Sequence, residues 1–119
     1  MGLDQYAYVA SKANTEYDDS SRQDVAYWRK HPNLQGWMEQ LYRNRGGNAE
    51  MFNGVELELT WADLEALEAD ILENNLPATS GFFFGSNSDE YYRHEDLAFV
   101  KQAKAELFTG LKVFYNSSW

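Results

Sequence analysis

Segments rich in β-forming residues occur near both ends of the chain. Residues 3–10 (LDQYAYVA) and residues 111–115 (LKVFY) carry apolar side chains on both faces of an extended segment. Residues 25–29 (VAYWR) are a shorter segment of the same kind, and residues 55–59 (VELEL) alternate strictly between apolar residues and glutamates. We expect these segments to be strands, with the first and the last paired near the centre of the sheet because both of their faces are apolar.

The residues after the second strand predict a helix with recognisable ends. Pro32 suits the first helical position, which makes His31 the expected N-cap, and Gly46 with Gly47 ends the helix. Between them, apolar residues recur at the spacing of one buried helical face. Gly36 lies inside this helix, where glycine costs about 1 kcal/mol relative to alanine. We therefore expect another element to pack closely over it.

Two further helices are predicted. Thr60 and Asp63 have the spacing of a capping box, and the helix that they start ends at the polar run NNLP, residues 74–77. The last helix is expected at residues 94–108, with a start as early as Ser88.

Together these elements predict one α+β domain over residues 1–119 with two layers. We expect about four mostly antiparallel strands packed against three helices. A chain of 119 residues with 44% hydrophobic and 16% aromatic residues is long enough and apolar enough to bury a core.

The negative charge of the chain is unevenly distributed. The net charge is −9, yet residues 22–45 are net basic, and residues 46–92 contain no lysine or arginine. An acidic protein repels phosphate backbones, so we do not expect direct binding to nucleic acid. The acidic stretch also has the charge that a nucleic-acid mimic needs, and the same charges are typical of a solvated helix face. The residues that would carry such mimicry are Glu65, Glu68, Asp70 and Glu73.

Composition excludes several other classes of site. The chain has no cysteine, which excludes disulfides and thiolate metal sites and suits a reducing compartment. We see no apolar run of the ~20 residues that cross a bilayer and no secretion signal, so we expect a cytoplasmic protein without a membrane partner. Neither a nucleophile motif nor a cofactor motif is present, so the sequence favours a non-enzymatic protein and names no cofactor.

Aromatic and basic residues come together at Tyr27, Trp28, Arg29 and Lys30. Such a cluster can stack on a base and hold a phosphate. The same pattern is typical of a strand end whose rings pack in the core while its cations remain solvated. The sequence leaves both interpretations open.

The segment at residues 80–92 (SGFFFGSNSDEYY) presents a similar choice. Residues 82–84 are either a strand buried on both faces, or Gly81 and Gly85 let a ligand approach the backbone while a ring stacks on it. This segment is not a phosphate loop, because no lysine follows Gly85.

Acidic and aromatic residues continue to residue 96 (DEYYRHED, residues 89–96). Glu90 and His94 would share a helix face and offer ligands for Mg²⁺, Ca²⁺ or Mn²⁺. Carboxylates at a helix start also favour the helix dipole without any metal. Because the spacing matches no metal motif, we assign no metal site.

Several short blocks of the chain resemble a known family. They are GLDQY (2–6), YWRK (27–30) with Trp37, LP (76–77), SGFFFG (80–85) and DEYY (89–92). They resemble a family of small, largely uncharacterised proteins of tailed bacteriophages, including marine cyanophages, with bacterial relatives. Gln5 departs from the Met that is more frequent at its position in that family. The resemblance implies a phage source and an intracellular setting, and it transfers no activity, cofactor or catalytic residue.

Three functional hypotheses follow. The leading one is a phage-type accessory protein that acts through an unknown protein partner or through self-association. The second is a protein that binds an anionic metabolite or nucleotide, or a weak enzyme, and the third is the acidic mimic. The ligand site of the second hypothesis would comprise Asp4, Tyr27, Trp28, Arg29, Lys30, Ser80, Gly81, Gly85, Asp89 and Tyr92.

Overall fold

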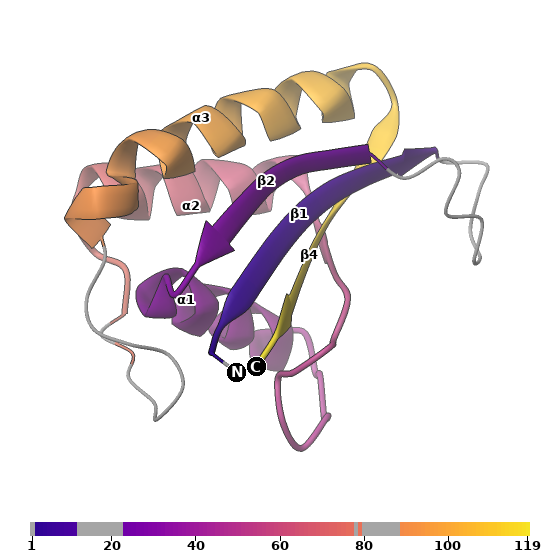
Figure 1. Ribbon diagram of the computed structural model, residues 1–119. Coiled ribbons are helices and arrows are strands. Elements are labelled where there is room, and N and C mark those ends of the chain that lie inside the picture. The colour runs from indigo at the N-terminus through magenta and orange to yellow at the C-terminus, as the bar shows by residue number, and fades with distance from the viewer. Residues whose placement is uncertain (1, 12–22, 78, 80–88) are drawn as a thin grey trace.

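The protein folds as the α+β domain that the sequence predicts. The computed structural model describes residues 2–11, 23–77, 79 and 89–119. In these ranges four strands and three helices follow one another, as Figure 1 shows: β1 (Asp4–Ser11), β2 (Gln23–Arg29), α1 (Pro32–Asn44), β3 (Leu57–Leu59), α2 (Trp61–Leu72), α3 (Asp89–Phe108) and β4 (Leu111–Ser118).

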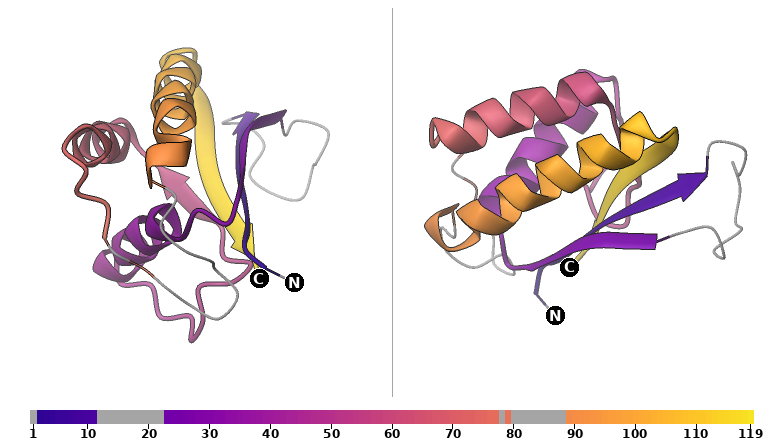
Figure 2. Two further views of the ribbon diagram at one scale, coloured as in Figure 1. Left: turned by 60° about the vertical axis from the view of Figure 1, so that its left-hand side comes forward. Right: turned by 90° about the horizontal axis from the view of Figure 1, so that it is seen from above.

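The four strands form one antiparallel sheet in the order β2-β1-β4-β3. The first and last strands are therefore its central pair, as their two apolar faces predict. All three helices lie on one face of this sheet, so the fold has two layers (Figures 1 and 2). Strand β2 is an edge strand, and the long helix α3 runs along it.

Strand alternation determines which side chains enter the core between the two layers. In β1, Ala7 and Val9 belong to the core cluster, and they are joined there by Val113 and Tyr115 of β4. Tyr6 faces the other way and remains 37% exposed. The sheet thus has an inner face covered by the helices and an outer face that is open at Tyr6, although Tyr8 on that face is buried and bonds to Glu56.

The first helix begins at Pro32 with His31 at its N-cap position, both as predicted. The His31 side chain makes no capping hydrogen bond. Its ring is instead fully buried, with Nε2 2.7 Å from Oδ2 of Asp96 in α3. The close packing expected over Gly36 is confirmed, because a Cβ there would lie 1.9 Å from Oγ1 of Thr79.

The remaining elements differ from expectation mainly at their ends. The capping box of Thr60 and Asp63 starts α2 as predicted. Strand β3 covers only residues 57–59 of the expected five, and α3 begins at Asp89, near the early limit. The strand expected at residues 82–84 lies outside the described residues. None of the helices described is both long and apolar enough to cross a membrane.

Candidate functional site

Strand alternation divides the predicted basic–aromatic cluster between the two faces of the sheet. The Trp28 side chain points into the core and is 1% exposed, whereas Tyr27 on the outer face is 55% exposed. The Tyr27 hydroxyl donates a 2.7 Å hydrogen bond to Oδ1 of Asp4, and Nε of Arg29 lies 3.5 Å from the same oxygen. The hydrogen bond to Asp4 is the main reason why the pKa of Tyr27 is raised.

Three of the predicted site residues are therefore neighbours on the open face, namely Asp4, Tyr27 and Arg29. Lys30 is exposed next to them and turns the chain with a φ of 58°. Ser80, Gly81 and Gly85 lie outside the described residues, as does the side chain of Asp89, so the structure leaves the second half of that site untested.

Tyr92, the last predicted site residue, does lie beside Arg29. Its hydroxyl donates to the Arg29 carbonyl oxygen at 2.7 Å and accepts from the Arg29 backbone N–H at 3.0 Å. Its ring stacks on His31, with the ring centroids 4.8 Å apart. Tyr92 thus links the start of α3 to the end of β2.

A buried carboxylate forms a second link between these two elements. Asp96 of α3 is 1% exposed. Its Oδ1 accepts a 2.8 Å hydrogen bond from Nε1 of Trp28, and its Oδ2 lies 2.7 Å from Nε2 of His31. A carboxylate in a dry interior costs several kcal/mol unless other groups bond to it, and here each of its two oxygens has a polar partner.

Buried amides extend the polar network beneath the sheet. Gln5 of β1 donates to the Tyr115 hydroxyl at 2.9 Å and accepts from the His31 backbone N–H at 2.9 Å. The Tyr115 hydroxyl donates to Oε1 of Gln35 at 2.5 Å, and Gln35 donates to the Phe52 carbonyl oxygen at 3.0 Å. Burial raises the pKa of Tyr115 far above its ordinary value. Because these groups hydrogen-bond to one another away from solvent, we interpret the network as structural.

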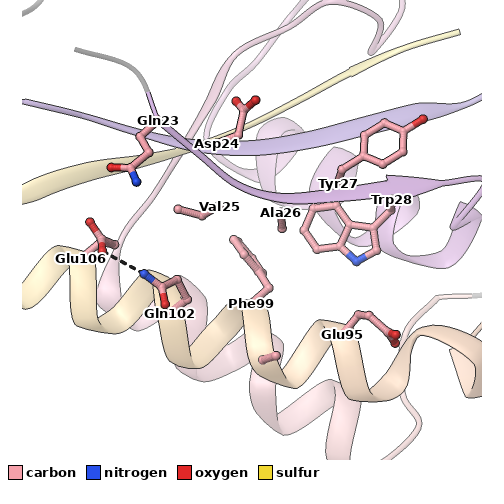
Figure 3. Close-up of a pocket in the computed structure, with 11 residues that line it drawn as sticks. Gln23, Asp24, Val25, Ala26, Tyr27, Trp28, Glu95, Phe99, Gln102 and Glu106 are labelled. Atoms are coloured by element: carbon pink, nitrogen blue, oxygen red, sulfur yellow. Dashed lines mark hydrogen bonds between the residues drawn. The ribbon is translucent and has the colours of Figure 1, made fainter.

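A solvent-open groove of about 450 Å³ runs between β2 and α3 (Figure 3). Its apolar part includes Trp28 and Phe99, which pack edge to face with ring centroids 5.1 Å apart. Val25 and Ala26 of β2 are only half-buried, and Ala98 of α3 is exposed. The groove is lined by Gln23, Asp24, Val25, Ala26, Tyr27, Trp28, Glu95, Ala98, Phe99, Gln102 and Glu106.

Every charged residue that lines this groove within the described part of the chain is acidic. These residues are Asp24 of β2 and Glu95 and Glu106 of α3. Glu106 accepts a 2.9 Å hydrogen bond from Gln102, as Figure 3 shows. An apolar strip with negative charge at both ends is complementary to a ligand that combines apolar and cationic groups. It offers no attraction to the anionic metabolite of the second hypothesis.

The acidic residues proposed for nucleic-acid mimicry have mixed surroundings in α2. Asp70 accepts a 2.8 Å hydrogen bond from Nε1 of Trp37, and Glu68 lies 3.5 Å from Nζ of Lys104. Glu65 and Glu73 are exposed. Within the described ranges, no group of three or more His, Cys, Asp or Glu side chains is placed to hold a metal ion.

No protein-family model, curated protein or solved structure matches this chain. The groove itself is therefore the feature from which function is inferred, and of its lining residues the sequence pointed only to Tyr27 and Trp28. Alternation within residues 25–29 would have shown that these two rings point in opposite directions. The groove forms because α3 lies along β2, and no pattern of neighbouring residues in the sequence predicts that arrangement.

Proposed function

We propose that the protein is a non-enzymatic accessory protein that binds a protein partner in the groove between β2 and α3. The partner segment that fits carries basic side chains on either side of an apolar one. The observation that supports this proposal is the combination in one groove of partly exposed apolar residues with three acidic residues, and with no basic residue among the described residues that line it. The phage origin and the cytoplasmic setting implied by the sequence resemblance are part of the same proposal.

The negative charge of the groove favours a different protein over a second copy of this chain as the binding partner. A two-fold contact between the β2 edges of two copies would bring the acidic groove residues of one copy close to those of the other. Like charges facing each other across an interface are unfavourable, and a basic segment removes that repulsion. We therefore favour a heterologous partner over self-association.

The proposal is tested by photo-crosslinking from inside the groove. A photoreactive amino acid is placed at Ala98, which is exposed and lines the groove, and in a control protein at Glu65, which is exposed on α2. In host extract we expect a crosslinked protein from position 98 and not from position 65. Mass spectrometry of the crosslinked peptide should identify a segment rich in lysine or arginine.

Charge reversal provides the matched control. The double variant E95K/E106K changes the charge of the groove by the same amount as E65K/E73K changes that of α2. We expect the first pair to remove the crosslink from position 98 and the second pair to leave it. Equal crosslinking in both variants, or a crosslinked segment without basic residues, would contradict the proposal.

A further inference from the structure

We infer that the partner segment binds in an extended conformation and hydrogen-bonds to β2 as a fifth strand of the sheet. This inference rests on the proposed function and adds the mode of recognition, in which main-chain bonds to a sheet edge supply affinity and side-chain pockets supply specificity. It depends on which peptide groups of β2 point away from β1.

One backbone hydrogen bond determines which residues of β2 bond to β1 and which point away from it. The backbone N–H of Lys30 donates to the carbonyl oxygen of Leu3 at 2.8 Å, so these two residues form a hydrogen-bonded pair. In an antiparallel ladder such pairs alternate with pairs whose peptide groups point outward. Trp28, which is opposite Gln5, therefore bonds to β1, whereas the peptide groups of Tyr27 and Arg29 point away from it.

The contacts of Arg29 independently support this alternation of inward and outward peptide groups. Its N–H and its carbonyl oxygen are both bonded to the Tyr92 hydroxyl of α3, on the side away from β1. Tyr92 thus occupies the outward groups at this end of β2 and protects that part of the edge. The Tyr27 peptide is the next outward position along the strand, and it lies in the groove.

The other end of the accessible edge is set by an irregularity. The register with β1 shifts between Ala7 and Tyr8, where Val25 has no partner residue. Such bulges change the local twist of an edge strand. We therefore place the main-chain bonds of the added strand at the outward peptide of Tyr27, between the contact of Tyr92 with Arg29 and the irregularity at Val25.

The acidic residues of α3 define the side-chain pattern of the segment. Glu95 and Glu106 are eleven residues apart in α3, which corresponds to about 16 Å along the helix axis. An extended chain rises about 3.3 Å per residue, so residues four positions apart are about 13 Å apart, and the long side chains of lysine or arginine can cover the remaining distance. Side chains on one face of a strand are two residues apart, so the pattern is basic-x-apolar-x-basic, with the apolar side chain on Val25, Ala26 and Ala98.

The orientation of Tyr27 identifies which amides of the segment form the ladder. Residues that oppose each other in a sheet point to the same face. Because the Tyr27 side chain is on the outer face, the residue paired with its peptide must be an outward "x" residue. The amides of the basic and apolar residues then point away from β2.

The probe is the peptide Gly-Lys-Ser-Val-Ser-Lys-Gly, titrated into ¹⁵N-labelled protein and followed by NMR. We expect shifts of amides in β2 and α3 around the groove. The same peptide with glutamate in place of lysine should not bind. A copy N-methylated at both serines should bind about tenfold more weakly or worse, because it loses main-chain bonds to β2. A copy N-methylated at valine is the matched control and should keep the affinity of the parent peptide.

The outcomes separate the binding mode from the function. Equal affinity of the two N-methylated peptides would overturn the fifth-strand mode and leave binding of a basic segment in the groove standing. No binding of the parent lysine peptide, or equal binding of the glutamate peptide, would count against the proposed function itself. Concentration-dependent dimerisation through β2 would overturn both, because the groove edge would then be occupied by a second copy.

Discussion

Replacing Asp96 with alanine tests how strongly the buried polar network holds α3 against β2. The change leaves Nε1 of Trp28 and Nε2 of His31 without the carboxylate that lies within 2.8 Å of both. Each buried group that loses its partner costs about 1–3 kcal/mol, so the free energy of unfolding should fall by about 2–6 kcal/mol. The total free energy of unfolding of a domain of this kind is only about 5–15 kcal/mol. Asp96→Ala should therefore be severely destabilised or unfolded.

The matched control is Asp96→Asn, which keeps the shape of the side chain and one acceptor oxygen. It should lose less stability than Asp96→Ala, because its amide oxygen can still accept the hydrogen bond from Trp28. Urea unfolding followed by far-UV circular dichroism at pH 7 measures both variants. A loss below about 1 kcal/mol for Asp96→Ala, the size of an ordinary surface substitution, would refute the assignment of Asp96 as the residue that holds the two elements together.

Two further predictions concern other contacts. Gly36→Ala should destabilise the protein by about 1–3 kcal/mol despite the better helix propensity of alanine, because the new Cβ meets Thr79 at 1.9 Å. Adding Thr79→Ala should recover most of that loss in thermal unfolding, and additive losses in the double variant would argue against the clash. The pKa of Tyr115 is raised in the folded protein, so its contribution to stability is present below pH 10 and lost as the pH rises above 10, where the unfolded chain gives up the proton. Between pH 10 and 11 wild type should lose about 1 kcal/mol more than Tyr115→Phe, and parallel losses in urea unfolding at the two pH values would contradict this.

Signals between neighbouring residues made much of the fold predictable. Pro32 fixed φ at the first helical position, and the hydroxyl of Thr60 capped α2 as its spacing with Asp63 indicates. Apolar residues on both faces of β1 and β4 predicted the central pair of the sheet. Each of these signals acts within a few residues, which is the range over which sequence patterns report physical constraints.

Contacts between residues that are far apart in the sequence could not be predicted from such local patterns. His31 occupies the N-cap position that Pro32 indicates, but no local pattern predicts that its ring contacts Asp96, 65 residues away. The candidate site failed in the same way, since Trp28 and Phe99 meet only because α3 lies along β2. Tyr27 and Trp28 are the exception, because alternation within one strand separates them without any knowledge of the tertiary structure.

The position of β1 beside β4 has a consequence for the newly made chain. The sheet cannot close until residues 111–118 have been synthesised, although residues 4–11 are made about 100 residues earlier. At ribosomal rates of about 5–20 residues per second, β1 waits about 5–20 s for this neighbour. During that interval one edge of β1 has no β4 to pair with, and unpaired edges promote aggregation. The sheet therefore closes late, after β4 has been synthesised. Until then the nascent chain is exposed to aggregation through the unpaired edge of β1.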